Sequence, residues 1–255
     1  MAKKRINKTK ILYVTTRVVI SLLLVFNVAA FFIDGDDSQK SRDLFNAAQS
    51  FLMLLCTFVP GFIERTGKVS VPNVMSVVFI CFCLAHFVVG EIGEVYVKSK
   101  IFDSILHTLS GSMIAILGFS IIRLLNNSDK IDLKLSPLFI SIFVVCFSVT
   151  VGVLWEIVEF GADAITGSNM QRYSHSVTRE PFLGKDALFD TMKDLILDMI
   201  GALFVSVISY LDLKKRKTLT KIKWFIERRK DLPVVIKEEL NVLNNVEETK
   251  NVRDN

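Results

Sequence analysis

Residues 136–160 read SPLFISIFVVCFSVTVGVLWEIVEF, an apolar run that carries two carboxylates near its end, Glu156 and Glu159. A helix needs about 20 mostly apolar residues to cross a bilayer, and this run is long enough. Five further apolar runs occur along the chain, at about 11–33, 44–63, 71–91, 102–124 and 190–211. The sequence therefore predicts an all-α, polytopic membrane protein built as a bundle of about six transmembrane helices.

The composition supports this class. The 255 residues are 51% hydrophobic with a mean hydropathy of +0.45, and 20 Phe stand against only 5 Pro. All four cysteines lie within apolar runs, so the sequence shows no disulfide framework. The basic clusters flank membrane segments and belong to no recognisable nucleic-acid-binding module, so we expect no nucleic-acid partner.

Basic residues gather at both ends of the chain and predict its topology. The sequence divides into a basic N-terminus, 1–10, a six-helix transmembrane domain, 11–213, and a basic tail, 214–255. The first apolar run has no clean cleavage site, which favours an uncleaved anchor over a signal peptide. An even number of helices places both termini on one side of the membrane, and their Lys and Arg residues predict that this side is cytoplasmic.

The tail has two parts of different character. Leu219, Ile222, Phe225 and Ile226 fall at helical spacing among Lys and Arg, which predicts an interfacial helix on the anionic lipids of the inner leaflet. The last residues, 241–255, are polar enough to predict disorder.

Ionisable residues recur inside four of the apolar runs, always toward the same predicted face of the membrane. An ionisable group inside a bilayer raises the free energy of the protein unless it has a partner. Because four segments carry such groups at a similar depth, we expect that the groups meet in one polar site near the outer face. Residues at i, i+3, i+4 and i+7 share a helix face, which groups the members of each run. The members are His86 in the third run, Asp103 and His107 in the fourth, Glu156 and Glu159 in the fifth, and Asp190, Asp194 and Asp198 in the sixth.

Converging carboxylates repel one another unless a cation binds, some are protonated, or basic groups pair with them, and the sequence leaves these three states open. Carboxylate and imidazole ligands suit a divalent metal such as Zn, Mn or Mg. The candidate metal ligands are His86, Asp103, His107, Glu156, Asp190, Asp194 and Asp198. The candidate catalytic residues are His107, Glu156 and Glu159. The candidate residues for a substrate anion, all in or beside the long connection 161–189, are Arg172, Arg179 and Lys185. An alternative to a role in the site remains open for three aspartates, which could be helix-end residues exposed to water: Asp103, Asp163 and Asp186.

Three segments resemble a known family. They are Phe102-Asp-Ser-Ile-Leu-His107-Thr-Leu-Ser-Gly111, Trp155-Glu-Ile-Val-Glu159-Phe, and Asp186-Ala-Leu-Phe-Asp190-Thr-Met-Lys-Asp194 followed by Ile200-Gly-Ala202. In order and spacing they resemble the YjdF-like family of bacterial inner-membrane proteins, and more distantly VanZ-like proteins. The resemblance covers about residues 84–208 and implies a multi-pass protein of the bacterial cell membrane. VanZ-like proteins are linked to the cell envelope, but this chain has Glu159 where their pattern has Gln, so the resemblance supports the site and not a reaction.

Three functions fit these observations. The first is a divalent-metal-dependent enzyme that acts on a lipid-linked or phosphorylated envelope substrate. The second is a proton- or cation-coupled transporter, although the acidic residues stop in the outer half of the predicted bundle. The third is a non-catalytic membrane sensor or assembly factor.

Overall fold

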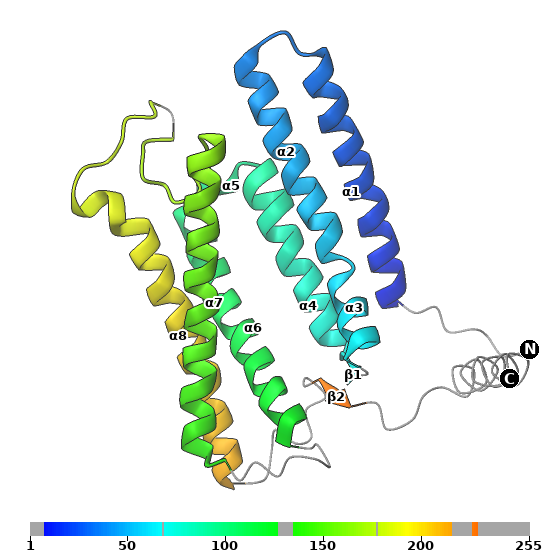
Figure 1. The fold of residues 1–255 in the computed structure, drawn as a ribbon, viewed down its shortest axis with the longest axis vertical. Coiled ribbons are helices and arrows are strands. Elements are labelled where there is room, and N and C mark those ends of the chain that lie inside the picture. Colours follow the sequence, from blue (N-terminus) through cyan, green and yellow to red (C-terminus); the bar gives the residue numbers. More distant parts are fainter. Residues whose placement is uncertain (1–7, 68, 127–134, 177, 216–225, 229–255) are drawn as a thin grey trace, which may run out of the picture.

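The computed structural model describes residues 8–67, 69–126, 135–176, 178–215 and 226–228, and these are mostly helical (Figure 1). The elements follow in the order α1 (Lys8–Ile33), α2 (Asp37–Cys56), α3 (Val59–Thr66), β1 (Val69–Ser70), α4 (Asn73–Cys83), η1 (Leu84–Ile92), α5 (Val95–Lys98), α6 (Lys100–Asn126), α7 (Pro137–Thr166), α8 (Lys185–Lys215) and β2 (Glu227–Arg228).

The described residues contain six helical stretches that are long and apolar enough to cross a membrane, which confirms the predicted fold class. They are Thr9–Ile33, Asp37–Thr66, Asn73–Ile92, Ile101–Leu125, Pro137–Thr166 and Lys185–Lys214. Large apolar side chains face outward on them, and Phe26 and Phe204 each expose 67% of their surface. An outer surface of this kind suits contact with lipid rather than with water.

The helix ends fall where local sequence provides capping groups. The Asp36 side chain accepts a hydrogen bond from the Ser38 backbone N–H at the start of α2. At the start of α7, Ser136 accepts one from the Phe139 backbone N–H, and Pro137 occupies the first turn. Gly167 ends α7 with a φ of 67°, a left-handed conformation that glycine adopts without strain.

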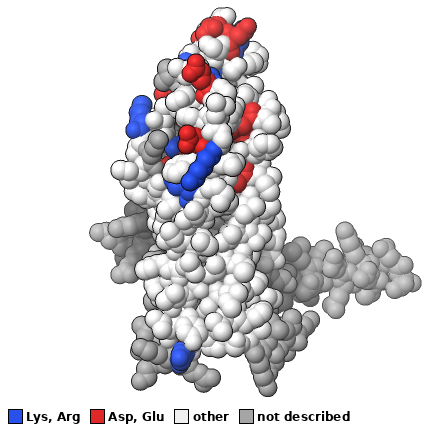
Figure 2. Space-filling model, turned by 90° about the vertical axis from the view of Figure 1, so that its left-hand side faces the viewer, with Lys and Arg blue, Asp and Glu red and all other residues white. Residues whose placement is uncertain are grey.

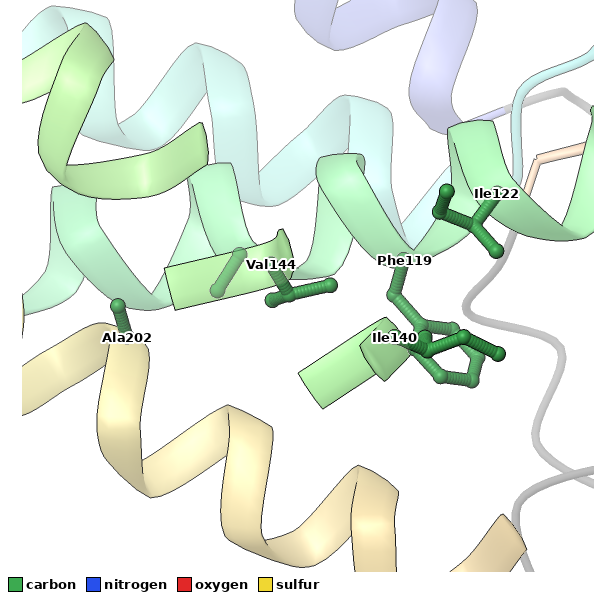
Figure 3. Close-up of a cluster of buried hydrophobic side chains, with 6 residues drawn as sticks. Phe119, Ile122, Ile140, Val144 and Ala202 are labelled. Carbon is green, nitrogen blue, oxygen red and sulfur yellow. The ribbon is translucent and has the colours of Figure 1, made fainter. Parts of the chain in front are cut away.

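The helices form two groups, α1 with α2 and the α4–η1 helix, and α6 with α7 and α8 (Figure 1). A cluster of buried apolar residues holds the second group together, and Figure 3 shows Phe119 of α6, Val144 of α7 and Ala202 of α8 within it. A separate cluster that includes Ile20, Met53 and Ile80 holds the first group. Most of the candidate site lies in the α6–α8 group.

Glycines bring α6 and α8 into close contact. A Cβ atom added at Gly111 would overlap the backbone of Asp198, and one added at Gly201 would overlap the carbonyl oxygen of Thr108. The Ser112 hydroxyl also donates to the Gly201 carbonyl oxygen at 3.1 Å. Small residues at such a crossing let helix backbones approach within a membrane.

The connections alternate between the two ends of the bundle, as the helix parity predicts. Residues 34–36, helix α5 and residues 167–176 and 178–184 lie at the same end, which we call the loop end (Figure 1). Figure 2 shows Asp, Glu, Lys and Arg side chains gathered toward the loop end, with a surface below them that is white apart from a basic patch at its foot. On the face in view, the described Asp and Glu side chains therefore lie toward one end of the bundle.

The chain beyond α8 is described only at residues 226–228. There, Glu227 and Arg228 form strand β2 and pair antiparallel with β1, with Val69 opposite Arg228. Glu227 and Arg228 are therefore extended rather than helical, because they pair with the backbone of β1, and Ile226 before them is not helical either. The rest of the predicted interfacial helix and the predicted disorder of 241–255 lie outside the described residues.

Candidate functional site

The centre of the site is the His107 imidazole of α6, which lies between carboxylates of two helices. Its Nε2 atom is 3.7 Å from Asp103 Oδ1 and 3.8 Å from Asp194 Oδ2. Its Nδ1 atom is 3.5 Å from Asp198 Oδ2. Both ring nitrogens therefore face carboxylates, and three aspartates from α6 and α8 surround one histidine.

Helical spacing and the glycine contacts together produce this arrangement. Asp103 and His107 are four residues apart on α6, and Asp194 and Asp198 are four apart on α8, so each pair shares a helix face. The close α6–α8 crossing then brings the two faces together. Ser110 donates from its hydroxyl to Asp198, and the absence of a side chain at Gly152 leaves room for the Asp198 carboxylate.

Two basic residues partly neutralise the aspartates. Lys193 Nζ is 3.0 Å from Asp103 Oδ2, 2.7 Å from Asp190 Oδ1 and 3.3 Å from Asp194 Oδ1. The Arg172 guanidinium lies 3.5 Å from Asp103 Oδ2 and 3.7 Å from Asp190 Oδ2. Both carboxylate oxygens of Asp190, and one oxygen each of Asp103 and Asp194, are thus paired with a basic group.

Arg172 reaches the site because Asp163 folds the connection that carries it. The Asp163 carboxylate accepts hydrogen bonds from the Ser168 hydroxyl and from the backbone N–H groups of Met170 and Gln171, at 2.6–3.0 Å. Arg172 itself has a φ of 49°, in the left-handed region. Asp163 is buried, so it is a structural residue of the loop rather than a helix end in water.

Glu156 and Glu159 of α7 are buried beside the aspartates but have different partners. Glu156 Oε2 accepts from the Gln171 side-chain amide at 3.3 Å, while its Oε1 has no hydrogen-bond partner among the described residues. Glu159 Oε1 accepts from the Trp155 indole N–H at 2.8 Å. Glu156 therefore keeps one fully buried carboxylate oxygen that accepts no hydrogen bond from the described residues.

His86 lies in a separate aromatic environment. Its Nδ1 is 2.5 Å from the Tyr96 hydroxyl, and its ring meets the edge of Trp155 with centroids 5.1 Å apart. Burial raises the pKa of Tyr96, and the nearby carboxylates raise it further, so its hydroxyl stays protonated and can donate to His86 Nδ1 in the tautomer that leaves this nitrogen unprotonated. Gly90 leaves space for the Tyr96 ring, which also lies 5.4 Å from the Arg172 guanidinium carbon.

The backbone around His86 departs from a regular α-helix. Residues 84–92 form η1, a π-helical segment, rather than the α-helix that the sequence predicted. A π-helix has more residues per turn than an α-helix, which rotates the side chains that follow it, and such segments are frequent at functional sites. His86 therefore borders the aspartate site without joining the His107 group.

Three further candidates lie away from the centre. Arg179 and Lys185 are exposed, and neither side chain makes an ion pair within the described part of the chain. Asp186 is exposed in the first turn of α8, which agrees with its reading as a helix-end residue. The structure thus brings Arg172 alone of the three anion-site candidates to the aspartates.

The donor set suits a divalent cation. One atom each from Asp103, His107 and Asp194 lies within 4.8 Å of the other two. Tetrahedral ligand atoms at about 2.1 Å from Zn²⁺ are roughly 3.4 Å apart, so the His107 separations of 3.7 and 3.8 Å need only small adjustments. Lys193 contacts the other oxygen of each aspartate, which leaves these three atoms directed at one space.

The comparisons with known proteins identify the class. Residues 15–215 match the model of a family described as "Predicted membrane protein (DUF2238)", and the chain belongs to this family. This membership agrees with the resemblance to the YjdF-like membrane proteins. Neither the search of curated proteins nor that of solved structures finds a match.

Proposed function

We propose that this chain is a metal-dependent membrane enzyme that acts on a lipid-linked or phosphorylated substrate at the outer face. The observation that carries the proposal is the convergence of Asp103, His107 and Asp194 from two helices on one space. A divalent cation bound there would polarise a phosphoryl or ester oxygen, or activate a water molecule.

Asp198 orients the central ligand. When His107 Nδ1 carries its proton toward Asp198, the Nε2 lone pair points between Asp103 and Asp194. A histidine that binds metal usually donates its other N–H to a carboxylate or carbonyl in this way. The Ser110 hydroxyl, by donating to Asp198, fixes that carboxylate in turn.

The remaining candidates have roles at the edge of this group. Glu156 is the proposed general base, because its Oε1 is buried and free to accept a proton. Glu159, held by Trp155, adds negative charge beside it. Arg172 can exchange its contacts with the aspartates for a substrate phosphate, to which guanidinium binds in bidentate fashion.

The test is phosphate or headgroup release from a panel of phosphorylated isoprenoids and phospholipids, with and without added Zn, Mn or Mg. We expect metal-dependent turnover that Asp194→Asn abolishes. The matched control is Asp186→Asn, the same change at an exposed position of the same helix, which should keep full activity. Equal activity in both variants, or turnover unaffected by chelation, would rule out the proposed scheme.

A second candidate rests on the ion pairs of Lys193 and Arg172. Because these two cations pair with the aspartates, the cluster also suits a non-catalytic sensor or assembly factor that changes state when the pairs break. In that case Lys193→Gln would alter the function while none of the substrates above is turned over.

We also propose that the loop end faces outward in the bacterial cell membrane. The basic residues before α1 and after α8 support cytoplasmic termini, by the positive-inside rule. A reporter fused at the C-terminus that is active only in the cytoplasm should be active, and the same reporter inserted after Gly35 should be silent. The opposite pattern would invert the topology.

A further inference from the structure

An apolar cavity of about 250 Å³ lies between α3, α4 and α6, one turn away from the aspartate site. Its α6 wall includes Ser110, Met113, Ile114 and Leu117, which follow one another at the spacing of a single helix face, and Ile116 beside them. These residues rise by roughly 10 Å along the helix axis, at 1.5 Å per residue. The cavity is therefore elongated along the direction in which the helices cross the membrane.

Ser110 connects the cavity to the site. It lines the upper end of the cavity, and its hydroxyl donates to the Asp198 carboxylate that contacts His107. His107 lies three residues nearer the loop end on the same helix. A molecule whose polar end lies at His107 would thus meet an apolar space directly below.

The residues that line the cavity indicate what kind of ligand it can bind. Apart from Ser76 and Ser110 the wall is made of aliphatic and aromatic side chains and one proline, and Met75 and Phe79 of α4 face the α6 stripe. All three helices belong to membrane-spanning stretches, so the surroundings supply hydrocarbon chains rather than water. Methionines on both walls suit a flexible apolar ligand.

The chain beyond α8 also contributes to the lining of the cavity. Ile226 is 4% exposed and contributes to the lining, and the pairing of β2 with β1 holds it there.

We propose that this cavity binds the acyl or isoprenoid chain of a single lipid whose polar group lies at the Asp103–His107–Asp194 group. The proposal rests on the proposed function for the identity of this lipid as the substrate. It adds that recognition is divided, with the headgroup held by ionisable residues of α6 and α8 and the hydrocarbon chain held between α4 and α6.

The first test measures lipid that remains bound after extensive detergent washing, by mass spectrometry of extracts from the full chain. We expect about one lipid per chain in the wild type and a loss of at least fivefold in Ile114→Trp, which fills the cavity. The matched control is Ile142→Trp, the same change at a 54% exposed position of α7, which should retain the lipid. Retention of the lipid in Ile114→Trp, or its absence from the wild type, would overturn the proposal.

The second test needs no variant and so does not depend on the folding of Ile114→Trp. A phospholipid with a photoactivatable diazirine in its acyl chain is added to the wild-type protein, irradiated after washing, and its adducts are mapped. We expect adducts at Met113 and Met75, on opposite walls of the cavity. Adducts confined to lipid-facing residues such as Ile142 would contradict the assignment.

Metal content measured on the same samples separates this inference from the proposed function. A cavity that holds lipid in a protein without metal would leave the lipid site standing and remove the metal-dependent reaction. A protein that binds metal but retains no lipid would remove the lipid site and leave the metal-dependent reaction standing.

Discussion

The contact between α6 and α8 can be tested by placing one methyl group at Gly201. A Cβ atom there would overlap the Thr108 carbonyl oxygen and lie 3.0 Å from the Ser112 backbone nitrogen. Backbone atoms cannot turn aside as a side chain can, so Gly201→Ala must push the two helices apart. Overpacking of this kind costs about 1–3 kcal/mol, and we expect a value near the upper end because the obstacle is backbone.

The assay is thermal unfolding in detergent, followed by the loss of helical signal. For a protein of this size a loss of about 3 kcal/mol corresponds to a fall in Tm of roughly 6–12 °C. Because Asp194 and Asp198 lie on the displaced helix, the same variant should also lose metal affinity.

The matched control is Gly161→Ala in α7, where an added Cβ meets nothing within 4 Å. Alanine is favoured over glycine within a helix by about 1 kcal/mol, so this variant should equal or exceed the wild-type Tm. Equal melting temperatures for Gly201→Ala and Gly161→Ala would refute the close crossing of α6 and α8.

Three further substitutions test single contacts of the site. Lys193→Met should destabilise the metal-free protein by about 3 kcal/mol in thermal unfolding, because it leaves buried carboxylates without their cation. Added metal should reduce the difference in stability between this variant and the wild type. Asp198→Asn should weaken metal binding by about 10- to 100-fold in a titration, since it removes the carboxylate that orients His107; an unchanged affinity would exclude that role. Tyr96→Phe should cost about 1 kcal/mol, the value of its hydrogen bond to His86, whereas a variant as stable as the wild type would show that this bond contributes nothing.

Much of the fold could be predicted because its signals are local. Each membrane-spanning helix is encoded by a continuous apolar run, and helix parity alone places the acidic segments at one end. The i, i+4 spacing of Asp103 with His107, and of Asp194 with Asp198, also predicted which side chains share a face.

The ion pairs of the site could not be predicted in the same way, because they join distant segments. Lys193 is three residues after Asp190 on α8, but spacing along one helix does not indicate that its side chain also reaches Asp103 of α6. Arg172 reaches the site only because Asp163 folds the connection into a compact loop.

Two backbone features could not be predicted from the sequence for another reason. The π-helical segment at residues 84–92 contains no Pro and is not rich in Gly, so no residue type distinguishes it from an α-helix in the sequence. It carries His86, whose ring contacts Tyr96. The pairing of β2 with β1 links segments more than 150 residues apart in sequence, and neither is long enough to show the alternation of a strand. Both features depend on the surrounding tertiary structure, which periodicity along the chain does not encode.

The central claim is that Asp103, His107 and Asp194 hold one divalent cation. The most direct measurement is the metal content of the purified protein by elemental mass spectrometry, after equilibration with Zn, Mn and Mg. Wild type and Asp186→Asn should each contain close to one metal ion per chain, and His107→Ala and Asp194→Asn should contain almost none. Metal-free wild type, or equal metal content in all four proteins, would contradict the account.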